Sequence, residues 1–485
     1  MRIPVLVALL AFLVLPARAA DSDTFRENPE LKSTIGLLDS WITSQMEYQQ
    51  LPGLSIAVLY GNDLVWSKAY GYADLQKKVP MTPQSVFRIA SITKTFTCTA
   101  IMQLRDRGKL RIDDPVSKYL PWFTYRNRFP EGPEPTLRML MTHTSGLPGE
   151  AAFPYWTDHK FPTREQMIEA FKGQESIFEA DTRFRYSNLG FAILGEVVAA
   201  VSGEPYARYI QKNILDPLGM KSTSVFPTDD QMKRLVTPYG RRLPDGSRVV
   251  STFTDSKALT AAANMSSTPE DLARYAAAHL QEGKNDNPLG MRGSSLREMH
   301  RPQWIQSNWK GAWGLGFGVW KSDERVTFGH GGFVGGNKSN LLVSPSEKTA
   351  VIVMINADDA MPSAFTSRAM NMLAPILKKL GTPPAEPVKY DPAWNVFVGT
   401  YRDPWGWETE VKEYKGKLVM YDHSYPPEEN PVSALVTLIP EKPGLFRQDP
   451  EDGNGELVTF EMDAKGKVVR VKTGENYIYP VPPGK

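Results

Sequence analysis

Three prolines lie within five residues of one another, at positions 383, 384 and 387. Because proline lacks a backbone N–H and its ring fixes φ, such a stretch neither continues a helix nor enters the middle of a sheet. The sequence also changes character there, from mixed helical and strand-like patterns to short β-rich runs. We therefore expect residues 381–390 to be a linker between a larger domain, residues 20–380, and a smaller domain, residues 391–485.

The smaller part has the pattern of an antiparallel β domain. Short runs rich in β-branched and aromatic residues are separated by turn residues, a spacing typical of a small barrel or sandwich. The runs that we expect to form strands are Phe397–Tyr401, Glu408–Glu413, Lys417–Tyr421, Leu435–Leu438, Leu457–Met462 and Val468–Lys472.

The sequence pattern of the larger part predicts strands at both ends and helices between them, which is an α+β fold. Near its start, Gly53–Tyr60 and Leu64–Tyr70 have the pattern of a hairpin that turns at residues 61–63. Helical stretches and proline-rich connections then alternate along the chain. Strand-like runs return at Gly316–Trp320, Asn340–Val343 and Ala350–Ile355, and a last helix is expected over Ser363–Leu380.

The N-terminus has the pattern of an export signal. Arg2 supplies a positive start, Ile3–Leu15 is an uncharged apolar run, and Ala17-Arg18-Ala19 matches a cleavage site. A membrane anchor is the alternative, but this run is too short to span a bilayer, and no later apolar run is long enough. We therefore expect residues 1–19 to be a signal peptide and the mature protein to be periplasmic or secreted.

Composition argues against several classes of function. The formal net charge is +2 and no basic block or stripe is present, so nucleic acid is not an expected partner. The six histidines show no H-E-x-x-H or similar spacing, and the single cysteine, Cys98, cannot build a thiolate metal site or an intrachain disulfide. We expect no metal ion and no cofactor.

A strand-like run that ends near Ile89 is followed at once by a helical pattern that begins at Ser91. Free N–H groups at a helix start favour a developing negative charge, and Lys94 lies one turn further on the same face. A serine needs a base to take its proton, and a lysine whose pKa is lowered by burial can be that base. Ser91 and Lys94 are our candidate nucleophile and base. The alternative is that Ser91 only caps the helix.

A second polar motif, Tyr186-Ser187-Asn188, precedes the helical region that begins near Ala192. A turn there can direct a phenol and an amide into one cleft. Tyr186 would relay a proton between nucleophile, base and leaving group, and Asn188 would hold a substrate carbonyl or position the lysine. The alternative is a polar turn whose buried tyrosine only makes a hydrogen bond.

A third motif is the glycine-rich run from Phe328 to Gly336. Its glycines, Gly332 among them, would let a strand edge approach a ligand closely. The backbone N–H near Phe333 would form an oxyanion hole with that of Ser91. His330 would orient the substrate or assist proton transfer. The alternative is a glycine-rich hairpin with an incidental histidine.

Taken in order, these three motifs resemble those of the serine β-lactamase-like family, which includes penicillin-recognising enzymes, D-stereospecific peptidases and related esterases. The resemblance covers most of residues 30–380. Connecting segments resemble the family too: Leu110–Pro121, Leu140–Pro148 and Ile214–Met220. It implies an antiparallel sheet flanked by helices, an inserted helical region, and a cleft between them. The C-terminal part resembles the lipocalin-like barrel of some members.

The resemblance also implies an acyl-enzyme mechanism on a small ester, amide or short peptide. Ser91, Lys94 and Tyr186 would be catalytic, while Asn188, His330, Gly332 and Phe333 would bind the substrate. Penicillin-binding members often have Lys-Thr-Gly where this chain has His330-Gly331-Gly332. Losing that lysine weakens the expectation of strong β-lactam carboxylate binding and leaves acyl transfer intact.

Two questions stay open at the level of sequence. Esters, D-amino peptides and β-lactams are all compatible substrates, and the oligomeric state is not predicted. The rival function is a catalytically silent exported protein that keeps the fold and binds cell-wall peptides or a partner. Trp405 and Trp407 of the expected barrel would then belong to its binding element.

Overall fold

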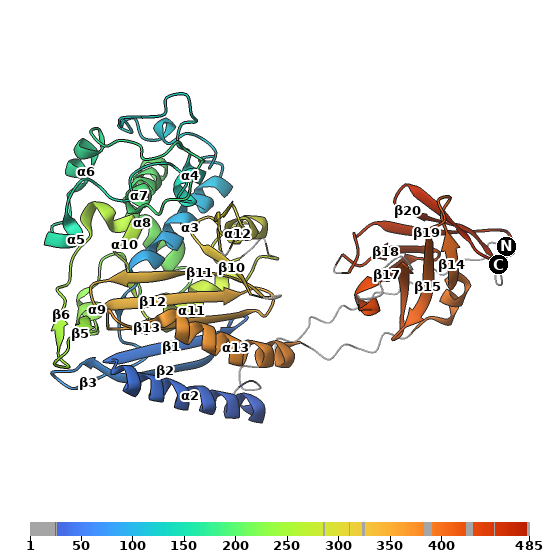
Figure 1. Ribbon diagram of the computed structural model, residues 1–485, viewed down its shortest axis with the longest axis horizontal. Helices are drawn as coiled ribbons and strands as arrows, with labels where there is room; N and C mark the ends of the chain where they lie inside the picture. Colours follow the sequence, from blue (N-terminus) through green and yellow to red (C-terminus); the bar gives the residue numbers. More distant parts are fainter. Residues whose placement is uncertain are drawn as a thin grey trace, which may run out of the picture. The chain divides into compact units, whose positions relative to one another are not determined.

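The computed structural model describes residue 25 and residues 27–284, 287–309, 311–322, 325–382, 390–422, 430–450 and 452–482. Contacts divide the chain into two units, with the boundary between Thr382 and Pro383, inside the expected linker (Figure 1). The expected signal peptide and residues 383–389 of the linker lie outside the described residues. Among the helices within these ranges, none has the length together with the apolar character that crossing a bilayer requires.

Strands from the two ends of the larger unit meet in one antiparallel sheet. Over the described residues it has nine strands in the order β3-β2-β1-β13-β12-β11-β10-β9-β8. The expected hairpin is present as β1 (Gly53–Tyr60) and β2 (Asp63–Asp74), and β13 (Thr349–Ile355) pairs antiparallel with β1. The other strands are β3 (Val79–Pro80), β8 (Trp304–Ile305), β9 (Ala312–Trp313), β10 (Gly318–Ser322), β11 (Arg325–Val334) and β12 (Asn337–Ser344).

Helices cover both faces of this sheet, which explains why β1 is buried along its whole length. Successive side chains of a strand point to opposite faces. Ile56 and Val58 therefore pack with α2 (Pro29–Gln49) and α13 (Pro362–Gly381) on one face. Ala57 and Leu59 belong to the larger core on the other face, which includes residues of α3 and α11 (Figure 1).

The inserted region is helical and packs around α3 (Thr93–Asp106), which is buried from Thr93 to Leu104. The fold is therefore the expected α+β arrangement, with α3 between the sheet and the inserted helices (Figure 1). The remaining helices of the unit are α4 (Leu137–Met141), α5 (Tyr155–Asp158), α6 (Arg164–Phe171), α7 (Asn188–Ser202), α8 (Tyr206–Ile210), α9 (Asp229–Lys233), α10 (Thr260–Ala263), α11 (Pro269–His279) and α12 (Gly293–His300).

Two short ribbons complete the larger unit. One joins β4 (Phe87–Arg88) to β7 (Ser266–Ser267), and the other joins β5 (Tyr239–Arg242) to β6 (Arg248–Val250). The first ribbon matters for function because it holds the segment directly before Ser91. It ties that segment to the residues that follow α10.

The smaller unit is a closed eight-stranded antiparallel barrel over the described residues. Its strands are β14 (Gly399–Arg402), β15 (Glu408–Tyr414), β16 (Lys417–Asp422), β17 (Leu435–Lys442), β18 (Leu445–Gln448), β19 (Leu457–Met462), β20 (Val468–Thr473) and β21 (Asn476–Pro480). The six expected runs all form strands, and β18 and β21 were not anticipated. Strand β21 closes the barrel by pairing with β14, Tyr401 opposite Pro480, a partner that local sequence does not reveal.

Candidate active site

Ser91 lies in a 3₁₀ turn, Ala90–Ile92, and the α-helix begins two residues later than expected, at Thr93. No side chain caps either the turn or the helix, so Ser91 is not a helix cap. Ala90 has a φ of 45°, which costs about 1 kcal/mol or more for a residue with a Cβ. The ribbon of β4 and β7 and a hydrogen bond from Ile89 N to Met265 O (2.9 Å) hold this backbone in place. The hydroxyl is thereby free to face a cleft.

Lys94 is fully buried in the first turn of α3, directly below Ser91. Its Nζ lies 3.1 Å from Ser91 Oγ, and it donates to Asn188 Oδ1 (2.7 Å) and to the carbonyl of Ala262 (3.0 Å). Burial lowers the pKa of Lys94 to about 7, against the opposing effect of Glu150. A substantial fraction of this amine is therefore neutral near neutral pH and able to accept a proton.

Tyr186 and Asn188 flank the residue that caps α7. Ser187 Oγ accepts from Gly190 N (2.9 Å), a standard N-cap, and this fixes its neighbours on either side. The Tyr186 ring lies 4.8 Å from Lys94 Nζ. Burial raises the pKa of Tyr186, while a hydrogen bond with Ser91 acts in the opposite direction, so the phenol keeps its proton at neutral pH.

His143 supports this turn from behind. Its Nδ1 accepts from Ser187 N (3.0 Å), and its ring lies 4.3 Å from that of Tyr186. Burial and the nearby Lys94 hold the pKa of His143 well below its usual value, so the ring is neutral. It orients the tyrosine and does not itself line the cleft.

Glu150 is a residue of the site that the sequence motifs did not indicate. Its Oε1 accepts from Asn188 Nδ2 (2.7 Å), and its Oε2 accepts from the Tyr155 hydroxyl. Asn188 thus bridges the ammonium of Lys94 and the carboxylate of Glu150. The only sequence signal was its place two residues after the connecting segment Leu140–Pro148.

The glycine-rich strand β11 lies beside the turn that carries Ser91. A Cβ on Gly332 would fall 2.1 Å from the carbonyl oxygen of Ile89, so only glycine allows this approach. His330 is buried, its Nδ1 donates to Gly331 O (2.5 Å), and its Nε2 has no partner among the described residues. Burial and Lys94 lower the pKa of His330 to about 3, so it is neutral. Phe333 is 56% exposed.

All seven residues that the motifs indicated meet at one place. A cleft of about 850 Å³ is lined by six of them, and Lys94 lies beneath its floor. These six are Ser91, Tyr186, Asn188, His330, Gly332 and Phe333.

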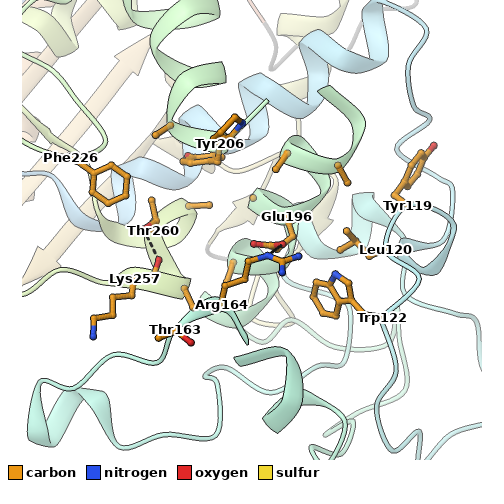
Figure 2. Close-up of a pocket in the computed structure, with 18 of the residues that line it drawn as sticks. Tyr119, Leu120, Trp122, Thr163, Arg164, Glu196, Tyr206, Phe226, Lys257 and Thr260 are labelled. Atoms are coloured by element: carbon orange, nitrogen blue, oxygen red, sulfur yellow. Dashed lines mark hydrogen bonds and ion pairs between the residues drawn. The ribbon is translucent and has the colours of Figure 1, made fainter. Parts of the chain in front are cut away.

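A second cavity, of about 720 Å³, lies on the other side of α10 (Figure 2). Thr260 and Ala261 line it, whereas Ala262 and Ala263 face Lys94 and the cleft. Its main polar feature is an ion pair between Arg164 and Glu196 (2.6 Å). It holds no hydroxyl paired with a buried amine, so it is not a candidate for acyl transfer.

The described residues contain no group of three or more histidine, cysteine, aspartate or glutamate side chains arranged to hold a metal ion. Cys98 is buried in α3, where burial raises the pKa of its thiol well above the usual value.

Known proteins are similar to this chain in sequence and in fold. A family model described as Beta-lactamase matches residues 38–372. "Beta-lactamase-like protein 2" of Dictyostelium discoideum is 27% identical over 470 residues, which cover 90% of this chain and 85% of that protein. The octameric penicillin-binding protein homologue from Pyrococcus abyssi is 26% identical, with a TM-score of 0.63 over 92% of this chain and 99% of that one. A D-stereospecific amidohydrolase from Streptomyces sp. has the same fold at 24% identity, with a TM-score of 0.56 over 72% of this chain and 98% of that one.

Proposed function

The chain belongs to the β-lactamase family, and from this premise we propose that it is a serine hydrolase that cleaves an ester or amide through an acyl-enzyme on Ser91. The observation that carries the proposal is the 3.1 Å contact between Ser91 Oγ and Lys94 Nζ, in a setting where burial lowers the pKa of Lys94 to about 7. A general base works best when its pKa lies near the operating pH.

In the first half-reaction, neutral Lys94 accepts the proton of Ser91 while Ser91 Oγ bonds to the substrate carbonyl carbon. The bond from that carbon to the leaving oxygen or nitrogen then breaks, and the leaving group takes up a proton by way of Tyr186. In the second half-reaction, water bonds to the acyl carbon and gives its proton to the same base. Ser91 leaves with a proton, and the carboxylic acid is released.

The negative charge on the carbonyl oxygen needs fixed donors. The backbone N–H groups of Ser91 and Phe333 are proposed as the oxyanion hole, because β11 packs against the Ser91 turn where Gly332 meets Ile89. Asn188 and His330 are proposed to position the substrate. His330 is neutral at physiological pH, so it offers a carboxylate no positive charge. Esters and amides without a carboxylate group are therefore better candidate substrates than penicillins, which carry one.

A fluorescent phosphonate probe and p-nitrophenyl acetate test the proposal together. Labelling and turnover are expected in the wild type and are expected to disappear in Ser91→Ala. Ser40→Ala, an exposed serine on α2, is the matched control and is expected to behave as wild type. Absence of both labelling and turnover in the wild type would contradict the proposal and favour a binding protein of the same fold.

We also propose that the protein is exported, on the strength of the N-terminal pattern of Arg2, the apolar run and Ala17-Arg18-Ala19. Mass spectrometry of the protein recovered from a periplasmic fraction or culture medium is the test. A mature chain that begins at Ala20 or Asp21 is expected. A chain that stays in the cytoplasm with residues 1–19 attached would refute it.

A further inference from the structure

Glu150 brings an unneutralised negative charge to the cleft. Both of its oxygens accept from neutral donors, Asn188 Nδ2 at 2.7 Å and the Tyr155 hydroxyl. No lysine, arginine or histidine of the described residues forms an ion pair with Glu150, although the side chain is half-buried and lines the cleft.

An aromatic surface lies beside this carboxylate. Trp156 follows Tyr155 in α5, lines the same cleft and is 45% exposed. Its ring packs against those of Tyr155 (5.4 Å) and Phe161 (5.2 Å), which hold it in place. A fixed, exposed indole next to a carboxylate is suited to an organic cation, because the ring face attracts positive charge.

The other charges of the cleft do not balance Glu150. Lys338 and Asp358 also line the cleft, and their opposite charges attract each other. Lys338 Nζ donates to Ala360 O (3.0 Å), and Asp358 accepts from Gly336 N (2.5 Å). His330 is neutral because its pKa is about 3. Lys94 acts as a base only in its neutral form. His159 also lines the cleft and forms no ion pair with Glu150. With Lys94 neutral, no cationic side chain of the described residues therefore forms an ion pair with the Glu150 carboxylate.

We propose that Glu150 and Trp156 select substrates that carry a positive charge near the scissile ester or amide, either a primary amine or a quaternary ammonium group. The proposal rests on the hydrolase function stated above and names the class of substrate for the same site. A carboxylate-bearing substrate would be repelled by Glu150.

Glu150 could instead act only by orienting Asn188 and, through it, Lys94. That role predicts the same loss for every substrate when Glu150 is changed. Selection of a cation predicts a loss for charged substrates beyond that for neutral ones of the same shape. Pairs of substrates that differ only in charge separate the two roles.

The experiment compares two isosteric pairs in the full-length protein. One pair is the p-nitrophenyl esters of betaine and of 3,3-dimethylbutyrate, with the charge on the acyl side. The other is the acetate esters of choline and of 3,3-dimethylbutanol, with the charge on the alcohol side. For each pair, the kcat/KM ratio of cationic to neutral ester is measured in the wild type and in Glu150→Gln, so the intrinsic reactivity of the esters cancels between the proteins.

For at least one pair we expect Glu150→Gln to lower this ratio by about tenfold. Trp156→Ala is expected to lower it by about threefold. Glu169→Gln, an exposed glutamate on α6 paired with Lys172, is the control that should leave it unchanged. Thermal unfolding of each variant confirms that the fold is kept.

Equal losses on both members of both pairs in Glu150→Gln would overturn the proposal, because Glu150 would then be a positioning residue only. Ser91-dependent turnover of the neutral esters would still stand in that case, so the hydrolase function would survive. If the wild type hydrolyses p-nitrophenyl acetate but neither pair, this proposal is overturned and the hydrolase function survives. If the wild type neither hydrolyses any of these esters nor reacts with the phosphonate probe, the hydrolase function fails and this proposal fails with it.

Discussion

The two sides of α10 show how one four-residue helix can border two unlike cavities. On one side, the carbonyl of Ala262 accepts from Lys94 Nζ and Ala263 lines the cleft of about 850 Å³. On the other side, Thr260 and Ala261 line the apolar cavity of about 720 Å³ (Figure 2). The two volumes are similar, so size does not distinguish a reactive site. A buried amine within reach of a hydroxyl does.

Helix α7 makes the same distinction along its length. Its first residue, Asn188, reaches Lys94 and Glu150, whereas Gly195 and Ala199 face the apolar cavity. Gly195 lets α7 and α10 approach closely, since a Cβ there would fall 2.4 Å from that of Ala261. The close packing of Gly195 against Ala261 therefore fixes the position of α10, and the hydrogen bond from Lys94 Nζ to the Ala262 carbonyl depends on that position.

Lys94→Met should give the largest effect, and it tests whether the buried amine makes the cleft side of α10 reactive. The variant keeps most of the buried volume but removes the base, so kcat/KM for p-nitrophenyl acetate should fall about 10³-fold. Lys172→Met, which replaces an exposed lysine on the same unit, should have no effect. Activity of Lys94→Met within tenfold of wild type would contradict the role of this amine.

The pH dependence of kcat/KM in the wild type should also report the ionisation of Lys94. Because the pKa of Lys94 is about 7 and the neutral amine is the active form, kcat/KM should fall roughly tenfold per unit below pH 7 and level off above it. Glu150 raises the pKa of Lys94, so Glu150→Gln should move this acidic limb to lower pH. A limb that moves to higher pH, or does not appear, would be inconsistent with a lysine base.

Gly195→Val tests whether a change of packing in the apolar cavity displaces α10 and so alters the cleft. The added side chain meets Ala261 and should displace α10, which destabilises the fold by about 1–3 kcal/mol. Moving the carbonyl of Ala262 should also reduce kcat/KM, by about tenfold. The control is Gly36→Ala on α2, where a Cβ meets nothing within 4 Å and stability should rise by about 0.5–1 kcal/mol. Thermal unfolding and ester hydrolysis measure both effects, and unchanged activity would show that the two sides are independent.

Arg164→Met should give the smallest effect. Its partner Glu196 lies in the apolar cavity, and the arginine side chain is about half exposed, so the ion pair contributes within about 1 kcal/mol. Ester hydrolysis should stay within about twofold of wild type, since no reacting group lies on this side. A large loss of activity would mean that the cavity takes part in the reaction.

Much of the larger unit was predictable because its signals are local. The hairpin of β1 and β2 and the spacing from Ser91 to Lys94 depend on residues close together in sequence. The start of α7 was expected near Ala192, whereas the helix begins at Asn188 and is capped by Ser187. The start of α3 was misplaced by two residues, because a 3₁₀ turn at Ala90–Ile92 intervenes. Glu150 was not predicted, because it acts through Asn188, which is 38 positions away.

By itself the sequence determined the elements, the three polar motifs and their order, since helix and strand periods and turn chemistry act over a few residues. Only the tertiary structure decided how reactive the site is. The pKa of Lys94 depends on its removal from water and on the charge of Glu150, while Asn188 and Ala262 hold its amine in place. All three residues come from distant parts of the chain. Burial and electrostatic interaction are properties of atoms that are close in space, and only folding brings those atoms together.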